Sequence, residues 1–278
     1  MLIAGIIGGV LALFLLYGYL SHHHLVTTIY TIPVDTEVKE YTCIMLSDLH
    51  CCTHGSENEK LFDRIREQKP DFILIPGDMV TKYLSVGDER VQRVVRFLEK
   101  IARQYPVYYA PGNHEIRLRD YPAYIEEMSR IGIRYVANSE IDFSDEKIRI
   151  YGLDLPIEWF RSKWELTVDD VGTFLNKKTA DEDAMNILLA HDPRYFKAYA
   201  AWGADLTVSG HLHGGVMRLP LLGGVLSPYL RLFPKYSGGM YEMDGRRMVV
   251  GRGLGSHHLK FRWFNPPELV VIQMRHKA

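Results

Sequence analysis

Residues 41–50 read YTCIMLSDLH, an apolar run that predicts a buried β-strand and ends in the polar cluster Asp48-Leu49-His50. Four later strand patterns end in the same way: Gly77-Asp78 follows residues 71–76, GNHE (112–115) follows 106–110, His191 follows 186–190, and GHLH (210–213) follows 205–209. In open α/β sheets, ligands bind beyond the carboxyl ends of the strands. The five polar clusters are therefore predicted to converge on one site.

Helical patterns separate most of these strands. Residues 88–105 carry apolar side chains at the spacing of an amphipathic helix, and three further ranges are predicted to be helical: 58–69, 120–131 and 194–202. A hairpin is expected to turn at Asp244-Gly245, and additional strands are expected at 133–137, 147–153 and 268–274. Neither a repeat nor a linker divides the body of the chain. We therefore predict one α/β domain with additional antiparallel strands.

The polar clusters combine carboxylates, imidazoles and one amide, a mixed set that suits Mn, Fe or Zn better than Ca or Mg alone. Each cluster is weak by itself, because Asp-x-His is common by chance and a lone His191 is more often a satisfied core residue. Five such clusters, in this order and each at a strand end, are a specific indication of one shared metal site. The glycines at 77, 112 and 210 are expected to let the backbone turn sharply, so that the next side chain points into the site.

Composition bears on nucleic acid and on disulfides. The chain has 33 basic and 34 acidic residues, so no basic excess indicates nucleic acid, and none is expected as a partner. The three cysteines, Cys43, Cys51 and Cys52, are too few for a disulfide framework. We expect Cys51 and Cys52 to pack as small side chains rather than to act as ligands or redox sensors, and free thiols favour a reducing compartment.

Residues 2–20 contain nineteen uncharged positions, enough for a helix that spans a bilayer. A cleaved signal peptide would need a basic n-region and a small-residue cleavage site, and neither is visible. A buried core helix is the weaker alternative, because the stretch is apolar all round. We predict an uncleaved single-pass anchor over residues 1–24 in the cell membrane, followed by one folded domain over residues 25–278. The short N-terminal tail favours an extracytoplasmic domain, whereas the free thiols indicate the opposite.

The ordered motifs SDLH, GD, GNHE, LLAHDP and SGHLHGG resemble those of the calcineurin-like metallophosphoesterases. The N-terminal anchor, RLPLLGG, and GRGLGS with NPPELVVIQ further resemble a membrane-anchored bacterial phosphohydrolase branch of that family. The resemblance covers residues 40–275. It implies a sandwich of two β-sheets flanked by helices, preceded here by one transmembrane helix.

The resemblance also implies a role for each polar residue. Asp48, His50, Asp78 and His213 would bind the first of two divalent ions, and Asp78 would bridge to the second. Asn113, His191 and His211 would complete the second site. His114 matches the catalytic histidine of the family. The chain departs from the branch at Leu212 and Val216, where Thr and Gln are usual, and this affects substrate contacts rather than metal binding.

Physical chemistry gives the same centre a mechanism. Two ions about 3.5–4 Å apart clamp the attacking and departing oxygens of an in-line displacement, and a hydroxide between them is available at neutral pH. His114 would protonate the leaving oxygen or steady the phosphoryl group. Glu115 and Asp192 are candidates to orient the metal histidines, or are surface charges.

The substrate is expected at the membrane, as a lipid-linked or envelope phosphodiester or pyrophosphate. Residues 214–236 form a long apolar connection directly after His213, with Arg218, Arg231 and Lys235 available for phosphate, and long structureless loops are usually functional. The insertion at 154–166 is expected to add the interfacial aromatic residues Trp159, Phe160 and Trp164. The alternative is that both segments only cover the body. Two alternatives to a phosphodiester or pyrophosphate hydrolase remain: a phosphomonoesterase that acts on proteins or small molecules, and a non-catalytic binding scaffold of the same fold.

Overall fold

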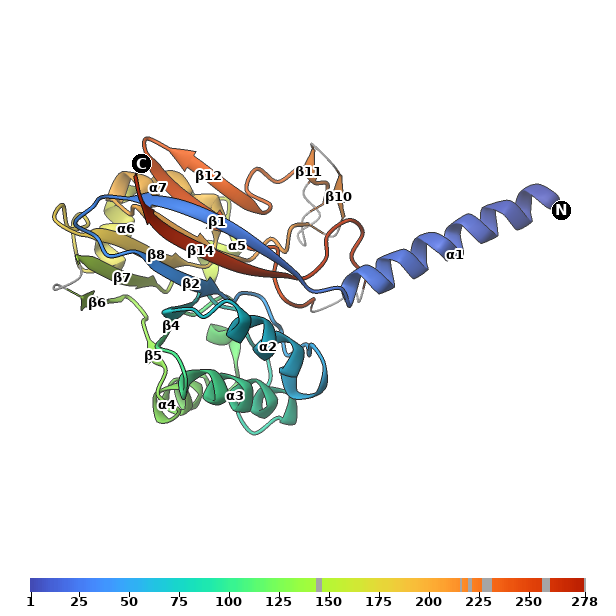
Figure 1. The fold of residues 1–278 in the computed structure, drawn as a ribbon, viewed down its shortest axis with the longest axis horizontal. Helices are drawn as coiled ribbons and strands as arrows, with labels where there is room; N and C mark the ends of the chain where they lie inside the picture. The colour runs from blue at the N-terminus through green and yellow to red at the C-terminus, as the bar shows by residue number, and fades with distance from the viewer. Residues whose placement is uncertain (144–146, 216, 220–221, 227–231, 257–260, 278) are drawn as a thin grey trace.

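A computed structural model describes residues 1–143, 147–215, 217–219, 222–226, 232–256 and 261–277. Eight residues of the apolar connection 214–236 lie outside these ranges, at positions 216, 220–221 and 227–231, and they include Val216 and Arg231. The predicted α/β architecture of two sheets with an N-terminal apolar helix is confirmed (Figure 1).

Two six-stranded sheets face each other in the body. The first has the order β1 (Val26–Val34), β14 (Glu268–His276), β2 (Tyr41–Met45), β3 (Phe72–Ile75), β4 (Val107–Tyr109) and β5 (Arg134–Tyr135). The second has the order β12 (Gly239–Met243), β13 (Arg246–Val250), β9 (Leu206–Ser209), β8 (Met185–Ala190), β7 (Ile148–Leu153) and β6 (Ser139–Phe143).

The central strands of each sheet are buried on both faces, which explains their nearly continuous apolar runs. In β2, Cys43 and Met45 point into the core between the sheets, whereas Ile44 packs against the outer helices. Successive side chains of a strand point to opposite faces, so one short run contributes to two cores. Helices cover the first sheet with α2 (Glu59–Glu67), α3 (Glu89–Ala102) and α4 (Tyr121–Arg130), and the second with α5 (Ile157–Arg161), α6 (Val168–Phe174) and α7 (Phe196–Trp202).

The N-terminal helix α1 (Leu2–His22) joins the body next to the start of β1 (Figure 1). β1 begins directly after α1 and runs parallel to β14, with Val26 opposite Glu268. β14 is antiparallel to β2, with Val270 opposite Met45. The carboxyl end of β2, which Asp48 follows, therefore lies beside the start of β1 and the end of α1.

Most of α1 extends away from the body, but its last turns are docked (Figure 1). Gly18, Ser21 and His22 are buried, while the preceding apolar side chains are exposed. Trp263 stacks on Phe14, with ring centroids 5.0 Å apart. The helix is long and apolar enough to cross a membrane, a property that it shares with signal sequences.

Several local predictions need correction. The stretch 25–40, expected as a polar, strand-like connector, contains the edge strand β1 (Val26–Val34). The strand expected at 133–137 is only Arg134–Tyr135, and β6 was not predicted. The connection 214–236 is not structureless, since β10 (Arg218–Leu219) and β11 (Gly223–Gly224) pair in it. The hairpin at Asp244-Gly245 is confirmed, with both residues at positive φ.

Candidate metal centre

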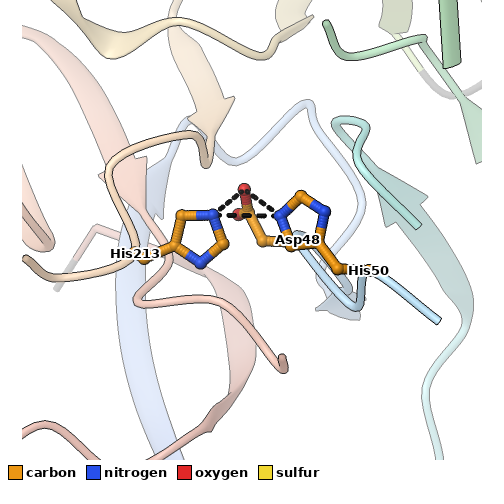
Figure 2. A group of neighbouring side chains, drawn as sticks. All are labelled: Asp48, His50 and His213. Carbon is orange, nitrogen blue, oxygen red and sulfur yellow. Dashed lines mark hydrogen bonds and ion pairs between the residues drawn. The ribbon is translucent and has the colours of Figure 1, made fainter. Parts of the chain in front are cut away.

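Buried acidic and histidine side chains gather where the strands of both sheets end. Three overlapping groups have ligand atoms within 4.8 Å of one another: Asp48, His50 and His213; His50, Asp78 and His114; and Asp78, His191 and His211. Figure 2 shows the first group, in which the imidazole rings of His50 and His213 face each other beside the Asp48 carboxylate. The Nε2 atoms of these two rings are 3.0 Å apart, and His213 Nε2 lies 3.4 Å from Asp48 Oδ1.

Asp78 lies between the groups. Its Oδ2 atom is 3.8 Å from His50 Nε2 and 3.1 Å from His191 Nε2. One carboxylate therefore faces histidines that come from different sheets, since His50 follows β2 and His191 follows β8. This is the placement that a ligand shared by two ions requires.

The backbone at the centre is held in an uncommon conformation. Five residues of the predicted ligand set have left-handed φ angles between 49° and 72°: Asp48, His50, Asp78, His211 and His213. Such conformations cost of the order of 1–3 kcal/mol each and persist where the surrounding structure imposes them. They turn consecutive residues away from the strand direction and into the site.

Two of the site glycines serve a purpose other than the sharp turn predicted from the sequence. Only Gly77 has a positive φ among the three predicted positions. A Cβ at Gly112 would collide with Asp78 Oδ1, and one at Gly210 would collide with Asp48 Oδ2. These glycines therefore make room for the carboxylates of the neighbouring strand end.

Backbone contacts fix the tautomers of two histidines. His191 Nδ1 donates to the Pro76 carbonyl at 2.6 Å, and His213 Nδ1 donates to the Gly255 carbonyl at 3.3 Å. With Nδ1 protonated, the neutral ring presents the Nε2 lone pair to the site, as a metal ligand must. Although burial opposes a charge on His191, Asp78 and Asp48 outweigh it and raise its pKa to about 10. A cation beside these carboxylates would replace that proton.

Two buried oxygen atoms give an independent indication of a cation. Asn113 Oδ1 and Asp48 Oδ2 have no hydrogen-bond partner within the described part of the chain. A buried polar atom without a partner is costly, and a bound metal is one of the groups that satisfies it. The donor set therefore fits divalent ions, and the buried Asn113 amide oxygen is available as a further ligand.

His114 lies at the edge of the same centre. Its Nδ1 atom accepts a hydrogen bond from the Lys82 backbone nitrogen at 3.1 Å, and its Nε2 atom is 3.9 Å from Asp78 Oδ2. In the neutral ring the proton must therefore be on Nε2, which faces the site. Burial lowers the pKa of His114 and favours this neutral form, although the Asp78 carboxylate opposes the shift.

Glu115 and Asp192 are fully buried, so the alternative that they are surface charges is wrong. Glu115 accepts hydrogen bonds from the backbone nitrogens of Asp78 at 2.8 Å and Gly112 at 2.9 Å. It therefore connects the Asp78 turn to the Asn113–His114 loop. Burial first, and then the Asp78 charge, raise the pKa of Glu115 to about 7. Asp192 pairs with Arg194 at 2.6 Å and lies 3.9 Å from His211 Nε2.

Phe160 was predicted as an interfacial aromatic residue, but it lines the centre instead. Its side chain is buried, and its ring centroid lies 6.0 Å from that of His191 and 5.4 Å from that of His211. Trp164, four residues later, is exposed. Sequence patterning could not separate the two, because the irregular segment around α5 has no period from which a buried face can be inferred.

The family of calcineurin-like phosphoesterases matches residues 41–215, a span that includes all the groups described above. The chain belongs to this family, and its buried His and Asp clusters form the binuclear type of site on which these metal-dependent phosphoesterases rely. It is a metallophosphoesterase.

Similar proteins include the uncharacterized metallophosphoesterase YkuE of Bacillus subtilis, which is 26% identical over 93% of this chain and 90% of its own length. Phosphodiesterase YaeI of Escherichia coli is 26% identical over 75% of this chain and 72% of its own. Among solved structures, a 5'-nucleotidase precursor from Thermus thermophilus is 15% identical with a TM-score of 0.44. That match covers 76% of this chain, which spans 48% of the solved one.

Proposed function

We propose that the chain hydrolyses phosphodiester or pyrophosphate bonds with two divalent transition ions, Mn, Fe or Zn. Asp48, His50, Asp78 and His213 would hold the first ion, and Asn113, His191 and His211 would hold the second together with Asp78. The observation that carries this proposal is the position of Asp78 between His50 and His191. When bound, two such ions supply Lewis acidity and a nucleophile from water at neutral pH.

His114 is proposed as the catalytic residue of this reaction. Because the Lys82 backbone N–H donates a hydrogen bond to His114 Nδ1, the neutral ring carries its proton on Nε2, which faces the site. From there it can hydrogen-bond a phosphoryl oxygen or give a proton to the leaving oxygen. Glu115 supports the loop that carries His114 and Asn113.

We further propose that the substrate is lipid-linked, with α1 as an uncleaved anchor and residues 25–278 as an extracytoplasmic catalytic domain. The carboxyl end of β2, which Asp48 of the proposed metal site follows, lies at the same edge of the sheet as the start of β1 and the end of α1. Large apolar side chains are exposed in two segments near the site in the sequence. Leu222, Leu232 and Phe233 lie in the connection after His213, and Phe264 packs beside Tyr17 of α1. Exposed large apolar side chains in the segments around the site support a membrane contact.

The test is a substrate screen of the full chain in detergent micelles with Mn²⁺. Phosphomonoesters, diesters, nucleotide sugars and lipid pyrophosphates are compared under the same conditions. Faster turnover of lipid-linked diesters or pyrophosphates than of their soluble headgroups is expected. Equal rates would remove the lipid proposal, preference for monoesters would favour a phosphomonoesterase, and no turnover by metal-loaded protein would favour a binding scaffold.

A further inference from the structure

The segment 261–265 contacts the C-terminal half of α1, next to the body of the protein. Trp263 stacks on Phe14 at an interplanar angle of 10°, and its Nε1 atom donates to the Phe14 carbonyl at 2.9 Å. A Cβ at Gly18 would lie 2.6 Å from Trp263 Nε1, so only glycine at this position lets the indole pack against the helix. The backbone nitrogen of Arg262 donates to the Gly18 carbonyl at 3.0 Å.

The same segment holds the loop that carries His213. Asn265 is fully buried, and its Nδ2 atom donates to the carbonyls of His213 at 2.7 Å and Gly215 at 2.6 Å. A side chain at Gly214 would collide with Asn265 Oδ1. Asn265 therefore fixes the backbone directly behind the metal-site histidine.

Arg262 acts on the His213 ring through a shared acceptor. Its buried Nη2 atom donates to the Gly255 carbonyl at 2.5 Å, and His213 Nδ1 donates to the same oxygen. Arg262 Nη1 also donates to the Arg252 carbonyl at 2.9 Å. These bonds fix the oxygen that orients the imidazole.

His213 needs such support more than the other histidines of the centre. Its side chain is 11% exposed, whereas those of His50 and His191 are 0% exposed. Its backbone is left-handed, with a φ of 52°, as are those of His50 and His211, so its exposure is what distinguishes His213. A residue at the rim in a strained conformation keeps its position only through the contacts that surround it.

We propose that Arg262 and Asn265 are positioning residues for His213, and that Trp263 makes this support depend on the docking of α1. Metal affinity at the group of Asp48, His50 and His213 then depends on the helix, while the group of Asp78, His191 and His211 does not. This inference concerns metal binding, so it does not rest on the substrate proposed above.

The experiment is a Mn²⁺ titration, followed by calorimetry, of the full apo chain in detergent micelles. His213→Ala identifies the binding step that belongs to the first group. Asn265→Ala and Trp263→Ala are expected to weaken that step by roughly 10–100-fold, the usual effect of removing a group that orients a ligand, and to leave the other step within about twofold. Trp263→Phe retains the stacking and should recover much of the affinity. Trp164→Ala, at an exposed tryptophan away from α1, is the matched control and should change neither step.

Two results would overturn the proposal. One is wild-type affinity at both steps in Asn265→Ala and Trp263→Ala. The other is equal weakening of both steps in Asn265→Ala, which would indicate a general loss of structure rather than positioning of His213. Because no substrate is present, failure of the proposed hydrolysis would leave this measurement valid.

Discussion

Glu115 accepts a hydrogen bond from the backbone nitrogen of Asp78 at 2.8 Å, so a fully buried carboxylate supports the turn that presents the proposed bridging ligand. Both Glu115 oxygens accept from donors, including Gly112 N at 2.9 Å and Tyr109 OH at 2.7 Å. The two charged residues therefore have separate roles. Asp78 faces the metal site, and Glu115 satisfies the backbone behind it.

Replacing Glu115 by Gln should place an amide NH₂ against backbone donors. Each donor left unsatisfied costs about 1–3 kcal/mol, and we expect metal affinity to fall roughly 10–100-fold. Elemental analysis after dialysis and thermal unfolding measure the two effects. Tyr109→Phe is the control, because it removes the hydroxyl donor to Glu115 and the contact with the Tyr124 hydroxyl but leaves the carboxylate and its bonds to the backbone in place. Full metal retention in Glu115→Gln would show that Asp78 does not need this support.

Gly210→Ala should disable the centre although it adds only one methyl group. The new Cβ would collide with Asp48 Oδ2, so the carboxylate or the strand end must move. Loss of bound metal and of most phosphoesterase activity is expected. Gly87→Ala provides the comparison, because its Cβ would have no heavy atom within 4 Å. Similar metal content in the two variants would argue against a close approach at Gly210.

Asp78→Asn and His114→Ala should separate metal binding from turnover. Purified protein is expected to hold close to two transition ions per chain, and Asp78→Asn should lose most of the activity because the bridge is weakened. His114→Ala should retain the metal and slow turnover by roughly 10²–10⁴-fold, the scale of general acid–base catalysis. Metal analysis combined with steady-state kinetics decides this. An active preparation with one ion or none would contradict the two-ion mechanism.

The N-terminal helix should remain attached to the mature protein. Because Gly18, Ser21 and His22 are buried against the body, cleavage after them would expose the docking face of Trp263. N-terminal sequencing of the membrane fraction should therefore begin at or near Met1. A soluble chain that begins between Ser21 and Thr31 would identify a signal peptide instead. A reporter fused at Ala278 determines on which side of the membrane the domain lies.

Asp154 should make stability depend on pH. Burial raises its pKa to about 6 from an ordinary value of 3.8, against a smaller opposing effect of the Tyr121 hydroxyl. The folded state therefore holds a proton that the unfolded state has released, so stability falls as pH rises from about 4 to about 6 and stays lower above that range. Asp154→Asn should stabilise the protein by about 1–2 kcal/mol at pH 8 and by nothing below pH 4. Urea unfolding of the variant and the wild type at both pH values measures this effect. The same difference in unfolding free energy at both pH values would contradict it.

The sequence by itself determined the strand ends that carry the site. Buried strands read as apolar runs, and polar residues directly after such a run mark its carboxyl end, so Asp48, Asp78 and His191 could be identified locally. The same local reasoning found the Asp244-Gly245 hairpin, because a type of turn that needs positive φ restricts the residues that can form it. These features depend on neighbours in the chain.

Only the tertiary structure decided how the strand ends meet and what supports them. The pairing of β14 with both β1 and β2 brings residues more than two hundred positions apart to one edge, and no local pattern encodes that pairing. The true role of Gly210, the burial of Phe160 beside His211 and the contact of Trp263 with Phe14 are likewise set by tertiary packing. Each depends on the distance between atoms that are remote in sequence, and such distances are set by packing of the two sheets rather than by the residues themselves.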